Sequence, residues 1–350
     1  MLSVLWQSLA HAAGSRRRVV ALFGGLAAAN VAAWALALVL LGGHPVLLGS
    51  AALAYTLGLR HAVDADHIAA IDNSVRKLMQ RGDKPLAAGL YFSLGHALIV
   101  VLMSAAVGFA ASQVTSRFET MKAYGSIVST AASAGFLLLL AAFNLVILVS
   151  VWRTFQAVKR GETFCEDDFD LLLNSRGLLA RVFRPLFRMV SKSWHLFPIG
   201  FLFGLGFDTA TEVALFGLSA TQAADGVSPL ALLVYPALFT AGMTLIDTLD
   251  GALMLGAYGW AFLKPVRKLY YNLTISAVSV IVALLIGGVE TLGLIAEGLK
   301  LEGPFWDEVG AINGSFGVLG YAIIAVFLLS WVVSALIYRL RGYDALDVRV

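Results

Sequence analysis

The sequence predicts an all-α integral membrane protein with about eight transmembrane helices. This prediction depends on the low share of charged residues, the length of the apolar runs and the placement of the positive charges. Hydrophobic residues make up 59% of the 350 residues and charged residues only 13%, and the mean hydropathy is +0.83. A soluble domain carries about 25% charged residues, so lipid must cover much of this chain in place of water.

The apolar runs are long enough to cross the hydrocarbon core, which requires about 20 residues of helix. The run that begins at Val19 follows three arginines and is too long for the apolar part of a signal peptide, so we take it as the first span. The second and sixth runs are long enough to tilt or to contain breaks. We place the spans near residues 19–42, 46–75, 87–111, 126–152, 196–221, 229–262, 269–294 and 314–339, within one membrane domain that covers residues 1–350.

The positive charges are segregated between the predicted loops. Most of the 25 Lys and Arg fall before the first span, in every second loop after it, or beyond the last span. Cytoplasmic loops carry an excess of Lys and Arg, and an odd number of spans would break this pattern. We therefore expect a multi-pass protein of the cytoplasmic (inner) membrane of a prokaryote, with both termini in the cytoplasm. The net charge of +3 reflects this topology and does not indicate a nucleic-acid partner.

The longest predicted loop, residues 153–195, would then be cytoplasmic. Positive residues recur at spacings of three and four in its second half, at Arg181, Arg184, Arg188 and Lys192, opposite apolar side chains. This pattern predicts an amphipathic helix that lies on the inner leaflet. A regulatory or gating element is the alternative.

A short internal match predicts an inverted repeat that relates spans 2–4 to spans 5–7. Gly58-Leu59 in the second span matches Gly204-Leu205 in the fifth, and residues 92–99 match residues 239–246. An offset of three spans gives the two copies opposite orientations in the membrane. Many secondary transporters are built in this way around a central site.

Ionisable residues are concentrated in the second span. Such groups cost several kcal/mol in lipid unless they are paired, hydrated or metal-bound. On a continuous helix His61, Asp64 and His67 stand three residues apart and form one stripe. Two imidazoles and a carboxylate within two turns suit a borderline divalent cation such as Ni²⁺, Co²⁺ or Zn²⁺. Asp66 points away from this stripe, so it either holds a histidine from a neighbouring position or lies at a break that turns it inward.

Polar residues in other spans extend the candidate site. The alternative to a metal site is a set of structural hydrogen bonds in which Arg60 neutralises one carboxylate, but one arginine does not offset all the acids of the second span, whereas a bound cation does. The single cysteine, Cys165, excludes a thiolate cluster. The candidate metal ligands are His61, Asp64, Asp66, His67 and His96. Candidates for the ion pathway or for the support of these ligands are Arg60, Asp72, Asn144, Asp208, Glu212, Asp247 and Asp250.

The chain resembles the nickel/cobalt transporter family of high-affinity nickel permeases. The blocks that carry the resemblance are residues 60–68, which fit the pattern H-x4-D-H, and residues 92–96, 205–212 and 242–251. The resemblance implies uptake of Ni²⁺ or Co²⁺ as a transported substrate, with no cofactor, through eight spans with cytoplasmic termini. It implies that His61, Asp66 and His67 are essential for transport, and that His96 and Asn144 influence the choice of metal. The motif thus favours Asp66 as the important carboxylate, whereas the helical wheel favours Asp64.

We therefore expect a secondary transporter that works by alternating access, with a divalent transition-metal ion and the lipid bilayer as its partners and no ATPase subunit. The alternatives are a membrane-embedded metalloenzyme and a transporter of another divalent metal, such as Zn²⁺ or Mn²⁺. The sequence contains no H-E-x-x-H pattern, which disfavours a metalloprotease. Imidazole ligands argue against Mn²⁺ and barely against Zn²⁺.

Overall fold

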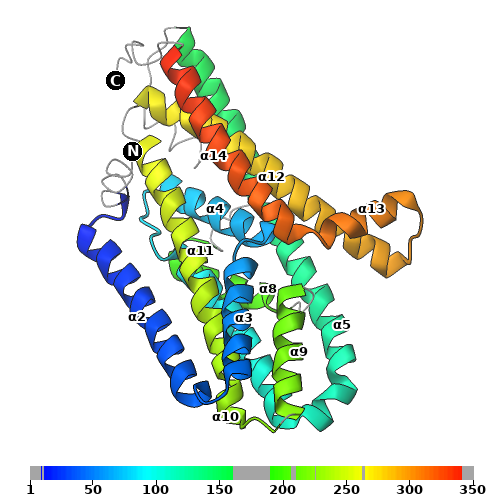
Figure 1. Cartoon of the computed structure of the whole chain (residues 1–350). Coiled ribbons are helices and arrows are strands. Elements are labelled where there is room, and N and C mark those ends of the chain that lie inside the picture. The colour runs from blue at the N-terminus through cyan, green and yellow to red at the C-terminus, as the bar shows by residue number, and fades with distance from the viewer. Residues whose placement is uncertain are drawn as a thin grey trace.

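The computed structural model describes residue 9 and residues 12–160, 190–205, 210–224, 226–261 and 265–340. Within these ranges the chain forms helices and no strand (Figure 1). The helices are α2 (Arg16–Leu41), α3 (Pro45–His61), α4 (Ala65–Gln80), α5 (Ala88–Lys159), η1 (Ser193–His195), α8 (Leu196–Phe203), α9 (Ala210–Ala224), α10 (Pro229–Leu232), α11 (Val234–Ala261), α12 (Pro265–Leu299), α13 (Pro304–Asn313) and α14 (Phe316–Leu340).

The starts of several helices follow from local chemistry. The hydroxyl of Ser15 accepts a hydrogen bond of 3.2 Å from the Arg17 amide and so satisfies a free donor at the start of α2. A proline is the first residue of α3, α10, α12 and α13. Proline fits this position because the first helical residue needs no amide hydrogen and has the φ value that the ring imposes.

The prediction of an all-α membrane protein is confirmed. Among the described residues, 5 helical segments, two of them in α5, are long and apolar enough to cross a membrane, or up to 7 if each of two bent pairs is one span. The remaining predicted span, residues 196–221, includes α8 and most of α9, which are too short to be counted separately. The number of eight spans therefore stays a prediction. So does the amphipathic helix of residues 153–195, because residues 161–189 lie outside the described ranges.

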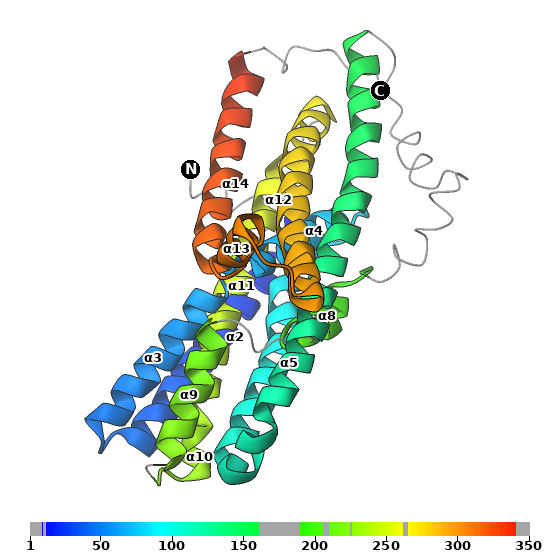
Figure 2. The same ribbon diagram turned by 90° about the vertical axis from the view of Figure 1, so that its right-hand side faces the viewer.

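The predicted third and fourth spans are joined by helix rather than by the loop that we expected. Both lie in α5, which has 72 residues and turns back between them (Figure 2). Figure 2 shows its cyan first part running down to the bottom of the view and its green last part running up from there. The two apolar segments within it, Ala88–Ala106 and Tyr124–Arg153, match the predicted spans 87–111 and 126–152.

The second span is broken, which corrects the continuous helix behind the predicted stripe. α3 ends at His61 and α4 begins at Ala65, with a bend of 52° between them. Asp64 has extended backbone angles, φ −66° and ψ 147°, at the position just before α4. Aspartate favours this position over the interior of a helix, because its short side chain competes for backbone hydrogen bonds. The C-terminal segment also bends, by 74° between α13 and the start of α14.

Buried apolar residues form two clusters that enclose this break. One cluster includes Ile68 and Ile71 of α4 and Phe92 of α5. The other includes Leu215 of α9 and Phe239 of α11, together with small residues of α3. The second span thus places the polar residues of the break between two apolar surfaces.

Candidate metal site

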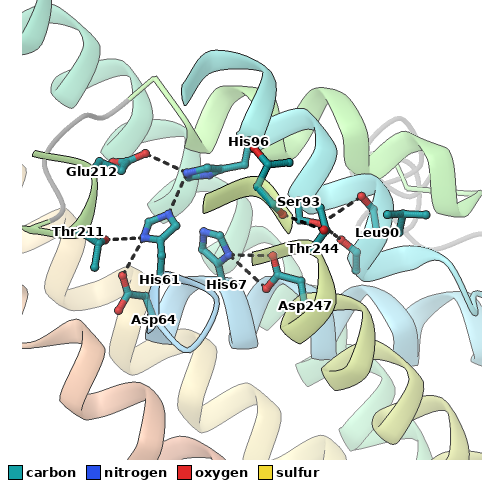
Figure 3. Close-up of polar contacts among 12 residues, drawn as sticks. His61, Asp64, His67, Leu90, Ser93, His96, Thr211, Glu212, Thr244 and Asp247 are labelled. Carbon is teal, nitrogen blue, oxygen red and sulfur yellow. Dashed lines mark hydrogen bonds and ion pairs between the residues drawn. The ribbon is translucent and has the colours of Figure 1, made fainter. Parts of the chain in front are cut away.

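Three imidazoles converge beside the break in the second span (Figure 3). His61 is the last residue of α3, His67 lies in the first turn of α4, and His96 comes from α5. Their ring centroids are 4.7, 4.7 and 4.9 Å apart, and the side chains are 1%, 0% and 3% exposed, respectively. One nitrogen from each ring lies within 4.8 Å of the others. Two nitrogens bound to one ion at about 2.1 Å can be no more than about 4.2 Å apart, so a small contraction completes a three-nitrogen site.

Each imidazole has a carboxylate as a hydrogen-bond partner. The carboxylates come from different parts of the chain: the break itself, α11 and α9. The pairs are His61 Nδ1 with Asp64 Oδ2 at 3.1 Å, His67 Nδ1 with both oxygens of Asp247 at 3.4 Å, and His96 Nε2 with Glu212 Oε1 at 2.9 Å. Carboxylates that hold ligand histidines in this way fix the orientation of the ring and raise its basicity.

These partners also determine which nitrogen can bind an ion. An ionised carboxylate only accepts, so the nitrogen that faces it carries the hydrogen and the opposite nitrogen has a free lone pair. In His67 that free atom is Nε2, which is buried and has no hydrogen-bond partner among the described residues. In His96, whose Nε2 faces Glu212, the free atom is Nδ1, which is also buried and has no hydrogen-bond partner among the described residues. In His61 the free atom is Nε2, which lies 2.9 Å from Nε2 of His96. A buried acceptor without a partner is costly, so this arrangement favours a ligand.

One functional neighbour was missed by the sequence reasoning. The hydroxyl of Thr211, in the first turn of α9, lies 3.0 Å from Nδ1 of His61. It shares this nitrogen with Asp64 and is likewise buried. Its only signal in the sequence is its place next to Glu212 within the block of residues 205–212.

The other acidic residues of the second span take different positions. Asp66 lies in the first turn of α4, half-buried, and its Oδ1 has no hydrogen-bond partner in the described ranges. Asp64 contacts Arg60 as well as His61, with 3.5 Å between Arg60 Nη1 and Asp64 Oδ1. The Arg60 side chain is 40% exposed, so this ion pair lies at the edge of the buried site.

A second polar cluster lies farther along α4. The buried carboxylate of Asp72 accepts hydrogen bonds from the hydroxyls of Tyr258 on α11 and Ser279 on α12. Asn144 of α5 donates to the side-chain oxygen of Asn73 at 2.6 Å. The structure therefore places Asp72 and Asn144 in this cluster, apart from the three imidazoles.

Asp250 and Asp208 are the two remaining candidates for the ion pathway. Asp250 lies one turn beyond Asp247 on α11, half-buried, and its Oδ2 has no hydrogen-bond partner among the described atoms. Asp208 falls outside the described residues. Sequence reasoning gave no indication of Tyr258 or Ser279, because single hydroxyls in apolar helices are common.

Comparisons with known proteins agree with this chemistry. A family model described as high-affinity nickel-transport protein matches residues 47–337. The chain is 57% identical over 334 residues to a high-affinity nickel transport protein of Cupriavidus necator, with 95% of each chain covered. It is 42% identical over 311 residues to the high-affinity nickel-transport protein NixA of Helicobacter pylori, which covers 87% of this chain and 93% of the relative.

A relative with a different substrate in its name is similar over almost the whole length. The cobalt transport protein NhlF of Rhodococcus rhodochrous is 36% identical over 333 residues, with 93% of this chain and 94% of the relative covered. No solved structure matches the chain.

Proposed function

Because this chain belongs to the family of high-affinity nickel-transport proteins, we propose that it takes up Ni²⁺, Co²⁺ or both across the cytoplasmic membrane of a prokaryote. The observation that carries the proposal is the buried cluster of three imidazoles, each with its own carboxylate, at a break in a membrane helix. The family and the relatives are transport proteins and not enzymes, so the alternative of a membrane metalloenzyme is not retained.

The donor atoms favour these metals. Imidazole nitrogens suit Ni²⁺ and Co²⁺, whereas Mn²⁺ prefers carboxylate and water oxygens. We infer that His61, His67 and His96 bind the ion and that Asp64 acts through His61. Asp66, whose Oδ1 has no described partner, is the carboxylate that meets the ion at the edge of the site. The relative named as a cobalt transporter supports including Co²⁺.

We further propose alternating access between the two copies of an inverted repeat. The repeat pairs Gly58 with Gly204 and Gly95 with Gly242. In the structure Gly58 and Gly242 lie where α3 crosses α11, and Gly95 and Gly204 lie where α5 crosses α8. A Cβ at Gly242 would be 2.8 Å from a backbone oxygen of α3, and one at Gly204 would be 2.9 Å from a backbone oxygen of α5. Replacing each glycine by its counterpart in the other copy of the repeat converts the α3–α11 crossing into the α5–α8 crossing. This equivalence is expected for two related halves.

The breaks support the same relation. The second span is interrupted between α3 and α4, and in the fifth span α8 ends at Phe203 and is followed by a turn at residues 204–205. The acidic residue in the first turn of α4 is Asp66, and that in the first turn of α9 is Glu212. These residues correspond under the offset that relates Gly58 to Gly204. Paired broken helices at a central site are typical of transporters whose halves rock against each other.

The segment of α4 beyond the imidazoles closes one side of the site. Every residue from His67 to Leu78 is buried. The hydrogen bonds from Tyr258 and Ser279 to Asp72 hold this segment against α11 and α12. With cytoplasmic termini, this segment separates the site from the cytoplasm, so release of the ion requires these contacts to open.

The membrane potential supplies the driving force. Moving one charge inward is worth about 2.3 kcal/mol per 100 mV, or about 4.6 kcal/mol for a divalent cation. This energy concentrates the ion without ATP, and the sequence contains no P-loop pattern to bind ATP.

The test is uptake of radioactive nickel into cells that produce the protein, with unlabelled Co²⁺, Zn²⁺ and Mn²⁺ as competitors. His67→Ala should abolish saturable uptake, and His44→Ala, which changes an exposed histidine at the start of α3, should leave it unchanged. Competition by Co²⁺ but not by Mn²⁺ supports the proposed substrates. Uptake that persists in His67→Ala, with both variants present in the membrane in equal amounts, contradicts the proposal.

A further inference from the structure

The break between α3 and α4 is covered by a helix that contributes no ligand to the site. Gly320 of α14 is buried directly against the backbone of Val63, in the middle of the break. A Cβ placed on Gly320 would lie 1.6 Å from the carbonyl oxygen of Val63 and 3.3 Å from the carbonyl carbon of Asp64. The backbone of α14 therefore contacts the residues that lie between His61 and Asp64.

Membrane physics explains why such a contact is needed. Non-helical backbone at membrane depth is tolerated only where protein or a water-filled cavity covers it, because lipid satisfies no backbone hydrogen bond. α14 provides this cover with one face: Gly320, Ile323 and Phe327 are buried, whereas Val318 and Tyr321 are exposed. Ile323 and Phe327 belong to the same apolar cluster as the buried residues of α4.

We propose that Gly320 is a positioning residue for the metal site: by allowing the α14 backbone to contact Val63, it holds the break in the shape that directs His61 at the ion and Asp64 at His61. The proposal rests on the proposed function, because it assigns Gly320 to that same site. It assigns a role in ion binding to α14, which lies outside the repeated spans.

The distances show how sensitive the site is to this contact. Real Cβ atoms essentially never approach other atoms closer than 3.0 Å, whereas a Cβ on Gly320 would lie 1.6 Å from the carbonyl oxygen of Val63. A methyl group at Gly320 therefore requires α14 and the break to move apart by about 1.4 Å. Metal–ligand distances hold to within about 0.2 Å, and a working site requires placement within about 0.5 Å. If even half of the movement falls on the break, His61 leaves the position that the site requires.

The experiment compares Gly320→Ala with Gly288→Ala in purified protein. Gly288 lies in α12, and a methyl group placed on it would have no described atom within 4 Å, so its substitution is the matched control. Titration calorimetry measures the Kd for Ni²⁺, thermal unfolding without metal checks the fold, and X-ray absorption counts the imidazoles on bound Ni²⁺. We expect Gly320→Ala to weaken binding about 10–100-fold, the range for groups that orient ligands. We also expect the X-ray absorption spectrum of Gly320→Ala to show one imidazole fewer on Ni²⁺ than the wild type. Gly288→Ala should match the wild type in both affinity and imidazole count.

Equal affinity of Gly320→Ala and the wild type overturns the inference, as does weaker binding with the imidazole count preserved. If Gly320→Ala does not fold, the inference is tested instead by hydrogen exchange of the backbone amides in the wild-type protein with and without Ni²⁺. Ni²⁺ should then protect the amides of residues 316–324 together with those of residues 61–67, and protection of residues 61–67 alone overturns the inference. Absence of Ni²⁺ binding by the wild-type protein would instead count against the proposed function.

Discussion

Asp247 offers a quantitative test of how the carboxylates support the imidazoles. Both of its oxygens lie 3.4 Å from Nδ1 of His67, and both side chains are fully buried. Ordinary N–H···O bonds measure about 2.7–3.2 Å, so this interaction is weak for its type. Removal of a group that orients a metal ligand typically costs about 10–100-fold in affinity. For Asp247→Ala we therefore expect the lower end, about tenfold, which corresponds to about 1.4 kcal/mol.

Two further variants give this prediction its control. Asp247→Asn keeps an oxygen that can accept from Nδ1 and should lose less affinity than Asp247→Ala. Thr248→Ala removes a neighbouring buried hydroxyl that has no described hydrogen-bond partner, and should leave binding unchanged. The assay is calorimetric titration of purified protein with Ni²⁺. An Asp247→Ala protein that binds Ni²⁺ as tightly as the wild type, or an Asp247→Asn protein that binds more weakly than Asp247→Ala, would refute the orienting role.

Three other substitutions test separate contacts. Thr211→Val removes a hydroxyl that shares its nitrogen partner with a carboxylate, so the Ni²⁺ affinity should fall only about fivefold, or about 1 kcal/mol, in the same titration. Tyr258→Phe removes one donor from buried Asp72. It should lower the free energy of unfolding by about 1–3 kcal/mol and change the uptake rate, with the Kd for Ni²⁺ unaltered. Gly58→Ala places a methyl group 2.1 Å from a backbone oxygen of α11, so the amount of folded protein in the membrane should drop sharply on an immunoblot.

The membrane helices could be predicted because apolar length and charge segregation are properties of the chain itself. A break in the second span was one of two alternatives that its length and Asp66 left open, and a break in the fifth span was not predicted, since a polar residue in an apolar run is compatible with a continuous helix or with an interruption. The stripe of His61, Asp64 and His67 was derived from a continuous helix, which is wrong. The structure still brings the two histidines together, with their ring centroids 4.7 Å apart across the 52° bend between α3 and α4.

The hydrogen-bond partners of the imidazoles depend on tertiary structure, so the spacing of residues in the sequence does not predict them. Asp247 and Glu212 were candidates as acidic residues within apolar spans, and their pairing with particular histidines follows from the packing of α11 and α9 beside the break. Asn144, which the family resemblance linked to the choice of metal, contacts Asn73 in the second polar cluster. A glycine such as Gly320 carries no signal in the sequence, because its role depends on a helix distant in the chain.

The most direct test of the metal site is X-ray absorption of Ni²⁺ bound to the purified wild-type protein and to His96→Ala. His96 is the proposed ligand that comes from outside the second span, so it distinguishes a three-helix site from a simple motif on one segment. We expect three imidazoles on Ni²⁺ in the wild type and two in the variant, with the remaining positions filled by oxygen. The same imidazole count in both proteins, or fewer than three in the wild type, would contradict the proposed site.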